Sequence, residues 1–277
     1  MPIILLLDNG SLRADATKQL RKLAQNLSIK SGRTVYPVSL QHACNIPVAD
    51  LDDQPAQVLV PFMLHHLSQG ERHFILLPLF FGKSRALTSF IPDEIDSLQA
   101  SFGDFSFDIA DVLYPLPKGE SLLGDIVYEN ILAVSKQYKY PLKNIVLVDH
   151  GSPVPRVTAV REHIATYLKS EFSLSDLQLE QAVMERREGS EYDFNGALLE
   201  DCLIKKAESG EKTAIVSLLF FLAGRHAGEG GDIVQICEKV MQKHPNFRVI
   251  ISPLVAEHGA LLEILCTRLQ AVAPILK

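Results

Sequence analysis

The chain has 277 residues, of which 47% are hydrophobic and 22% charged, and its formal net charge is −6. This composition is that of an ordinary globular protein, which excludes disorder, and the length favours two domains over one. The acidic balance and the lack of any basic run exclude nucleic acid as a partner, because phosphate binding needs a concentrated basic surface.

The first predicted element is a buried strand at 2–7, within the segment MPIILLLDNGS. This segment has neither a charged leader nor a small-residue cleavage site, so it is not interpreted as a signal peptide. No stretch of the chain approaches the roughly 20 apolar residues of a membrane helix. We therefore expect a cytoplasmic protein with no membrane partner. The scattered cysteines favour buried thiols in a reducing compartment; they are Cys44, Cys202, Cys237 and Cys266.

The remaining elements alternate between short apolar strands and amphipathic helices. In the first half we predict further strands near 33–39, 73–81 and 107–113. In the second half the predicted strands are 144–149, 177–184, 213–221 and 247–252, and the predicted helices are 155–172, 193–209, 229–244 and 257–271. Strands that are apolar throughout and alternate with helices indicate an α/β fold with parallel sheets covered on both faces.

Two segments of the sequence occur twice. IILLLDNGS at 3–11 returns as NIVLVDHGS at 144–152, an offset of 141 positions. GERHFILLPLFFGKSR at 70–85 matches GEKTAIVSLLFFLAGR at 210–225, an offset of 140 positions. Two blocks in the same order at nearly constant offset indicate an internal duplication. We therefore predict two tandem parallel-sheet α/β domains, at 1–140 and 141–277.

Polar residues follow three predicted strands of the second half. His150 follows the first strand, Glu185 the second, and His226 lies in the loop after the third. Ligands of open parallel sheets bind beyond the carboxyl ends of the strands, so these side chains are expected at one edge of the sheet. Two imidazoles and a carboxylate suit a borderline divalent metal such as iron, cobalt, nickel or zinc.

The first half provides an internal control for this site. Asn9 occupies the position of His150, Ala86 that of His226, and Gln41 falls roughly opposite Glu185. The surrounding frame of Asp-x-Gly-Ser and Leu-Phe-Phe…Arg is kept in both halves. The first half has thus lost every residue that could titrate or bind a metal strongly, although the residues around the site are kept. This pattern indicates one functional copy in 141–277 and one degenerate copy in 1–140.

The motifs DHGS at 149–152 and LFFLAGRH at 219–226, followed by Asp232-Ile233, resemble the class II chelatase family. This family includes the CbiX, CbiK and SirB sirohydrochlorin chelatases and, more distantly, the protoporphyrin ferrochelatases. The resemblance implies a lyase that inserts a divalent metal into sirohydrochlorin or a related tetrapyrrole in cobalamin or sirohaem biosynthesis. Cobalt and iron are the implied metals, with nickel as a third candidate, and the metal is a substrate; no organic cofactor is implied.

By this resemblance, His150, His226 and Glu185 are the metal ligands and catalytic residues. Neutral imidazole binds such ions without excess charge, and a nearby carboxylate can ligate the ion or raise the basicity of the imidazole. The tetrapyrrole carries carboxylates, which arginine grips in bidentate fashion. The candidate substrate-binding residues are Ser152, Arg156, Arg225 and Asn9, with the macrocycle expected in a crevice between the two halves.

The sequence departs from the family in the segment HAGEGGD, where His226 and Asp232 are separated by a longer, glycine-rich loop. A non-catalytic tetrapyrrole- or metal-binding protein of the same fold is the alternative function. The sequence distinguishes neither the physiological metal nor the oligomeric state. A hydrolase triad of Asp149, His150 and Ser152 is disfavoured, because adjacent residues of an extended chain point in opposite directions. His258, after the last strand, is a minor candidate.

Overall fold

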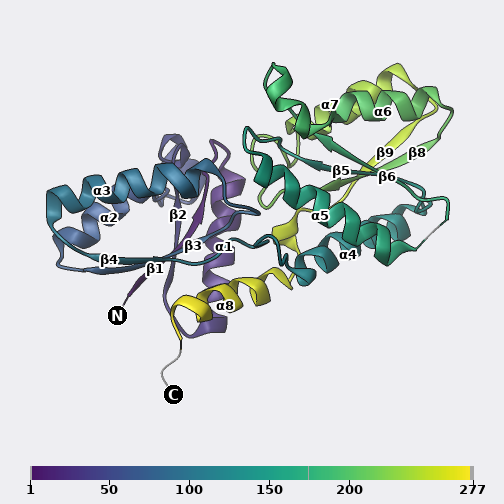
Figure 1. Ribbon diagram of the computed structural model, residues 1–277. Helices are drawn as coiled ribbons and strands as arrows, with labels where there is room; N and C mark the ends of the chain where they lie inside the picture. Colours follow the sequence, from purple (N-terminus) through teal and green to yellow (C-terminus); the bar gives the residue numbers. More distant parts are fainter. Residues whose placement is uncertain (1, 174, 275–277) are drawn as a thin grey trace. The chain divides into compact units, whose positions relative to one another are not determined.

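The computed structural model describes residues 2–173 and 175–274, which form two compact units (Figure 1). The first unit contains the chain up to Lys118 together with the chain from Ala260 onward. The second unit contains Gly119–Gly259. Each unit is an α/β unit built around its own parallel sheet, which confirms the predicted fold class.

The first unit has a parallel four-stranded sheet in the order β2-β1-β3-β4. Its strands are β1 (Ile3–Asp8), β2 (Val35–Ser39), β3 (His73–Pro78) and β4 (Ser106–Ile109). Its helices are α1 (Ala14–Ser31), α2 (Leu59–Ser68), α3 (Ile91–Phe102) and, from the end of the chain, α8 (Leu261–Val272).

The second unit repeats this order and adds one short strand, giving β7-β6-β5-β8-β9. Its strands are β5 (Asn144–Asp149), β6 (Gln178–Val183), β7 (Ala197–Leu198), β8 (Thr213–Leu218) and β9 (Arg248–Ile251). Its helices are α4 (Ser121–Tyr138), α5 (Pro155–Phe172), α6 (Leu199–Glu208) and α7 (Asp232–Lys243).

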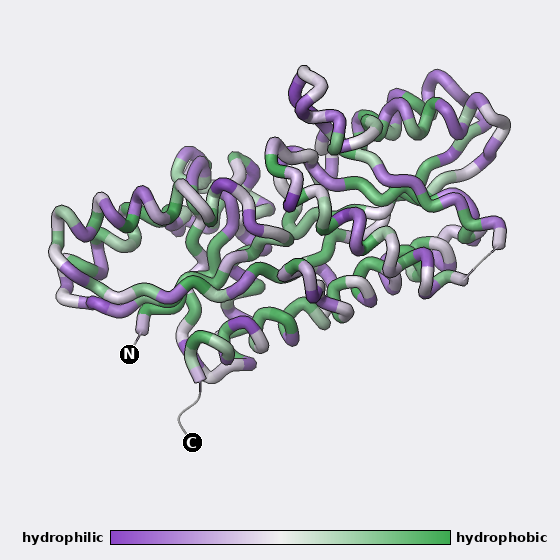
Figure 2. The backbone as a smooth tube through the Cα atoms, viewed as in Figure 1, coloured by the Kyte–Doolittle hydropathy of each residue, from purple (hydrophilic) through white to green (hydrophobic). Residues whose placement is uncertain are grey.

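Each sheet is covered by helices on both faces because its central strands are apolar throughout. Every residue of β5 is buried, as are all but the first residues of β1 and β3. Strand residues and the buried faces of α6 and α7 form one hydrophobic core, and those of α2 and α3 form another. Figure 2 shows hydrophobic strands inside each unit and helices whose hydropathy alternates along their length. This three-layer arrangement leaves the carboxyl edge of each sheet for polar side chains.

The final helices of the two sequence repeats are exchanged between the compact units. Helix α8 packs against α1 and β3 in the first unit, and α4 packs against α5 and β8 in the second. The predicted ranges 1–140 and 141–277 follow the sequence repeat, whereas the compact units follow where the apolar faces of α4 and α8 are buried. Sequence periodicity identifies such an apolar face but not the sheet that covers it.

Three predicted helices begin later than expected, and glycines explain two of these differences. The predicted helix 193–209 becomes a 3-10 helix (Ser190–Asn195), strand β7 and then α6, because Gly196 at φ +79° turns the chain so that β7 pairs with β6. The predicted helix 229–244 begins only at Asp232, after Gly228 and Gly230 at positive φ. The predicted helix 257–271 begins at Leu261, after a 3-10 helix at Val255–Glu257.

Cys202, Cys237 and Cys266 are buried as predicted, but Cys44 is exposed. The prediction for Cys44 was wrong because, in the short 3-10 helix Ala43–Asn45, Ala43 is the residue that enters the core and Cys44 is left exposed. None of the helices in the described part of the chain combines the length and hydrophobicity that a membrane span requires.

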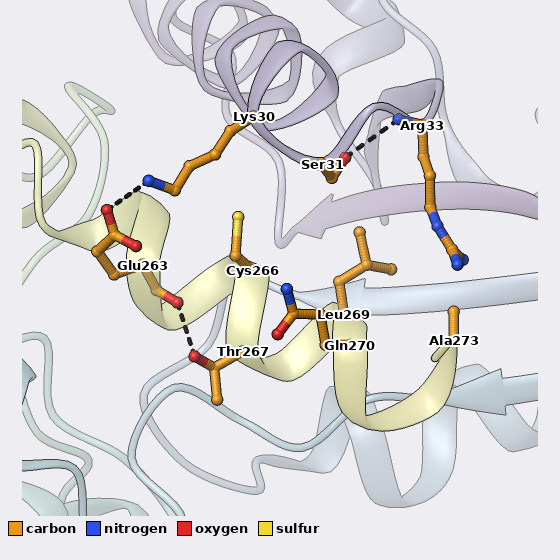
Figure 3. Close-up of a pocket in the computed structure, with 9 residues that line it drawn as sticks. All are labelled: Lys30, Ser31, Arg33, Glu263, Cys266, Thr267, Leu269, Gln270 and Ala273. Atoms are coloured by element: carbon orange, nitrogen blue, oxygen red, sulfur yellow. Dashed lines mark hydrogen bonds and ion pairs between the residues drawn. The ribbon is translucent and has the colours of Figure 1, made fainter. Parts of the chain in front are cut away.

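A small polar pocket of about 180 Å³ lies between α1 and α8 in the first unit (Figure 3). In the second unit the corresponding space is filled by Tyr128 and Phe172, whose ring centroids lie 4.7 Å apart. Ser31 stands at the position of Phe172, and it leaves space that an ion pair between Lys30 and Glu263 borders. The pocket therefore lies where the first unit has no counterpart of the Tyr128–Phe172 contact.

The two units treat their equivalent buried aspartates differently. Asp149, at the end of β5, lies 2.6 Å from the Arg161 guanidinium of α5, which opposes the rise that burial causes in the pKa of Asp149. Asp8 is the equivalent residue of β1, but Leu20 occupies the position of Arg161. Burial raises the pKa of Asp8 to about 6 although Ser39 donates a hydrogen bond to it, and among the described residues its Oδ1 atom has no hydrogen-bond partner.

Asp8→Asn is expected to make the first unit more stable at high pH. Because the pKa of Asp8 is about 6 in the folded protein and the ordinary value is 3.8, its contribution to stability is complete below pH 3.8 and is lost as the pH rises through 6. The loss amounts to about 3 kcal/mol, which asparagine would not undergo. Urea unfolding of both proteins between pH 4 and pH 8 measures this difference. A difference that stays constant with pH would contradict the prediction.

Candidate functional site

The ends of β5 and β6 hold His150 and Glu185 side by side. The pairing of the two strands continues past their ends: Met184 N donates to Asp149 O at 2.8 Å, and Glu185 N donates to His150 O at 3.1 Å. Gly151 adopts φ +94°, and a Cβ atom there would lie 2.0 Å from Glu185 O. Glycine is therefore required for the close approach of these two loops.

His150 contacts Glu185 through its Nε2 atom. Its Nδ1 atom lies 3.1 Å from Gly151 O, which can only accept a hydrogen bond. Its Nε2 atom lies 3.2 Å from Glu185 Oε1, so these two ligand atoms face each other. Two ligands bound at about 2.1 Å to one tetrahedral ion lie about 3.4 Å apart. The His150 and Glu185 side chains are 45% and 62% exposed, so an incoming ion can reach both.

His226 is held by a carboxylate of its own. Its Nδ1 atom lies 2.7 Å from Asp232 Oδ2, at the start of α7. The loop between them folds tightly: Ile233 N donates to His226 O at 3.0 Å, and a Cβ atom on Gly231 would lie 3.0 Å from the same oxygen. Donation from Nδ1 to Asp232 leaves Nε2 as the basic nitrogen of His226. The longer glycine-rich loop thus retains Asp232 at the site.

The two imidazole rings lie next to each other. Their centroids are 4.6 Å apart and the rings are nearly perpendicular, at 74°. Over residues 2–173 and 175–274, no group of three or more His, Cys, Asp or Glu side chains is already arranged to hold a metal ion. The site therefore consists of two imidazole–carboxylate pairs, His150–Glu185 and His226–Asp232, rather than a closed cage. An open arrangement of this kind suits an ion that must be passed on.

The same edge of the first unit keeps the backbone geometry without these groups. Leu40 N donates to Asp8 O at 2.9 Å and Gln41 N to Asn9 O at 3.4 Å, which aligns Gln41 with Glu185. A Cβ atom on Gly10 would lie 1.8 Å from Gln41 O, as in the second unit. Ala86 begins a π-helix (Ala86–Phe90) that runs directly into α3 in place of a loop. The first unit thus preserves the frame, with Asn9, Gln41 and Ala86 at the positions of His150, Glu185 and His226.

The predicted substrate-binding residues have different local settings. Ser152 Oγ accepts a hydrogen bond from Val154 N at 3.1 Å, and Ser11 Oγ accepts the equivalent bond from Arg13 N, also at 3.1 Å, so this turn is common to both units. Asn9 and Arg156 are exposed. Arg225 is 74% exposed at its side chain, with its Nε atom 3.8 Å from Asp232 Oδ2.

Other polar residues near this edge pair with one another. Arg186 lies 3.3 Å from Asp193, and the Arg187 guanidinium lies 5.9 Å from the ring centroid of Tyr192. The minor candidate His258 lies 2.8 Å from Glu129. Asp149 turns away from His150 and toward Arg161, so the geometry of a hydrolase triad is not formed.

Sequence reasoning did not include Asp232 among the site residues. The aspartate follows His226 in the motif, but the path of a loop with three glycines cannot be read from periodicity. Its position at the start of α7 was the available signal, because a helix N-terminus favours a carboxylate there.

The fold and the paired imidazoles define a chelatase-like α/β protein. The CbiX family model matches residues 144–272, which is somewhat less than half of the chain. The resemblance to class II chelatases is thereby confirmed. No protein in the curated set matches the chain.

Three solved structures share the fold along nearly the whole chain. SirB from Bacillus subtilis with Fe³⁺ is 16% identical, with a TM-score of 0.68 over 99% of this chain and 96% of that one. The sirohydrochlorin chelatase SirB from Bacillus subtilis subspecies spizizenii in complex with cobalt is 15% identical, with a TM-score of 0.67 and the same coverage. CbiX, the terminal enzyme for biosynthesis of siroheme in denitrifying bacteria, is 13% identical, with a TM-score of 0.60 over 97% of this chain and 98% of that one.

Proposed function

We propose that this protein is a chelatase that inserts Co²⁺ or Fe²⁺ into sirohydrochlorin or a closely related tetrapyrrole. The observation that carries the proposal is the His150–His226 pair, with ring centroids 4.6 Å apart and a separate carboxylate beside each ring. Solved structures with the same fold contain Fe³⁺ or cobalt, and one of them is a sirohydrochlorin chelatase. These likenesses support both the substrate class and the metals.

The reaction requires a site that holds a divalent ion loosely and accepts protons. Insertion forms bonds from the metal to the pyrrole nitrogens, while two pyrrole N–H protons leave the macrocycle. In the proposed site, Nε2 of His150 and Oε1 of Glu185 bind the ion, because they are neighbouring ligand atoms at 3.2 Å. His226 accepts one of the two protons at Nε2, where Asp232 beside Nδ1 stabilises the imidazolium that forms, and the other proton passes to water.

The test is turnover with purified protein. Sirohydrochlorin is mixed separately with Co²⁺, Fe²⁺ and Ni²⁺ in excess over the protein, and metallation is followed by the change in absorbance. The proposal predicts many turnovers per protein molecule with at least one of these metals. A stoichiometric spectral change that stops after one equivalent would instead identify a non-catalytic tetrapyrrole- or metal-binding protein.

A further inference from the structure

A buried arginine joins three segments beneath the His150–Glu185 pair. Arg161, on α5, has a side chain that is 3% exposed. Its NH1 group donates to Asp149 Oδ1 at 2.6 Å and to Ala182 O at 3.2 Å, and its NH2 group donates to Asn195 O at 2.6 Å. A single planar guanidinium therefore binds the end of β5, the end of β6 and the loop before β7.

Asn195 continues this network to the loop that carries His150. The residue is 1% exposed, and its amide group binds both backbone groups of Ser152: Oδ1 accepts from Ser152 N at 3.0 Å, and Nδ2 donates to Ser152 O at 2.9 Å. Oδ1 also accepts from the Thr158 hydroxyl at 3.1 Å, and Nδ2 donates to Tyr192 O at 3.1 Å. All polar atoms of the Asn195 side chain are thus used to hold the chain.

We propose that Arg161 and Asn195 are positioning residues that set the distance between His150 and Glu185. Asp149 and Ser152, which the network fixes, flank His150 and Gly151 in sequence. The same guanidinium fixes Ala182, which lies near the end of β6 and three residues before Glu185. Buried groups hold both ends of the His150 loop and the end of β6. The imidazole and the carboxylate are therefore kept in a fixed relative position, because the loops that carry them do not change conformation.

The first unit has the same backbone frame but lacks this network. Leu20 stands at the position of Arg161, and it is buried in the same face of its helix. The loop before Val58, which forms a single parallel bridge with Ser39, is instead held by Arg21, which donates to Leu51 O at 3.0 Å and to Gln54 O at 2.6 Å. A loop anchor is therefore present in both units. The anchor that is buried and also binds the preceding aspartate is Arg161, and it occurs in the unit that has His150. Within its described residues, the first unit, which has Asn9 at that position, lacks such an anchor.

This inference rests on the proposed function only for its kinetic consequence. Arg161→Lys keeps a positive charge beside Asp149, but an ammonium group cannot bind three acceptors in the fixed geometry of a guanidinium. Asn195→Ala removes the contacts to Ser152 and keeps Arg161. In both variants the affinity for Co²⁺ alone is expected to fall by about 10- to 100-fold, since partners behind metal ligands have effects of this size. The kcat for metallation should fall similarly, while KM for the tetrapyrrole stays within about threefold of the wild-type value.

The matched control is Lys206→Met. Lys206 is an equally buried cation of the second unit, with a side chain 3% exposed, and it pairs with Glu180 at 2.7 Å. Glu180 lies within β6, away from its carboxyl end. Lys206→Met therefore removes a buried ion pair from the same sheet without touching the His150 loop, and its Co²⁺ affinity and kcat should equal those of the wild type.

Imidazole ¹⁵N–¹H correlation spectra at one pH provide a readout that does not depend on chelation. In the wild type and in Lys206→Met, the His150 ring should give one set of signals with the same chemical shifts; in Arg161→Lys and Asn195→Ala these signals should shift or broaden, because the ring is no longer held in one position. Wild-type protein that binds Co²⁺ but never metallates would overturn the proposed function and leave these comparisons intact. Co²⁺ affinities and His150 spectra equal to those of Lys206→Met would overturn the positioning role.

Discussion

The variant His150→Ala/His226→Ala is expected to bind Co²⁺ more than about 100-fold more weakly than the wild type. Loss of partners behind metal ligands alone typically weakens binding by 10- to 100-fold, so removing two ligands should exceed that range. Glu185 and Asp232 remain in the variant, but two carboxylates without imidazole are a poor site for a borderline ion. Titration calorimetry with Co²⁺ and no tetrapyrrole gives the affinity directly.

The control for this prediction is His65→Ala/His66→Ala, which also removes two imidazoles. These histidines lie at the end of α2, and their ring centroids are 5.4 Å apart. Within the described residues, no carboxylate pairs with either ring as Glu185 and Asp232 pair with His150 and His226, so the loss of these two imidazoles should leave Co²⁺ affinity unchanged. Equal affinities for the wild type and for the His150/His226 variant would show that the ligand assignment is wrong.

Either single variant, His150→Ala or His226→Ala, is expected to lower kcat for metal insertion by about 10²- to 10⁴-fold. Loss of a positioned proton acceptor has an effect of this size, and loss of a metal ligand adds to it. The fold should be unaffected, because the two side chains are 45% and 31% exposed and lie at the sheet edge. Steady-state metallation gives kcat, and circular dichroism verifies folding. A decrease of less than about threefold in both variants would contradict the proposed roles.

Much of the site could be predicted from sequence because parallel strands end at a common edge. His150, Glu185 and His226 each follow a strand, so the alternation of elements alone indicated that they converge. The duplication then supplied the equivalence of Asn9 and Ala86. The alignment of Gln41 with Glu185 was loose in sequence, and the backbone hydrogen bonds past β2 and β6 make it definite.

The supporting residues were not predicted, because their roles depend on the path of loops and on which faces become buried. Asp232 reaches His226 only through a turn made by glycines. Arg161 had a visible signal: it is a charged residue at a buried position of α5, where the first repeat has Leu20. A charged residue at a core position must have a partner, and comparison of the two repeats identifies it. The exchange of α4 and α8 had no comparable signal, since either sheet offers an apolar face.

A comparison of Asn9→Ala with His150→Ala tests whether the metal chemistry belongs to the second unit alone. Both substitutions remove a side chain at the same position of the repeated frame, so they disturb equivalent turns. An amide neither titrates nor binds these ions well, so Asn9→Ala should leave kcat for metallation within about twofold of the wild-type value. A higher KM is expected if Asn9 contacts the macrocycle.

The decisive measurement is kcat for cobalt insertion into sirohydrochlorin by the wild type, Asn9→Ala and His150→Ala in one assay. We expect nearly equal kcat for the wild type and Asn9→Ala, and a kcat about 10²- to 10⁴-fold lower for His150→Ala. A decrease in kcat for Asn9→Ala as large as that for His150→Ala would contradict a site confined to the second unit, because both units would then contribute to catalysis.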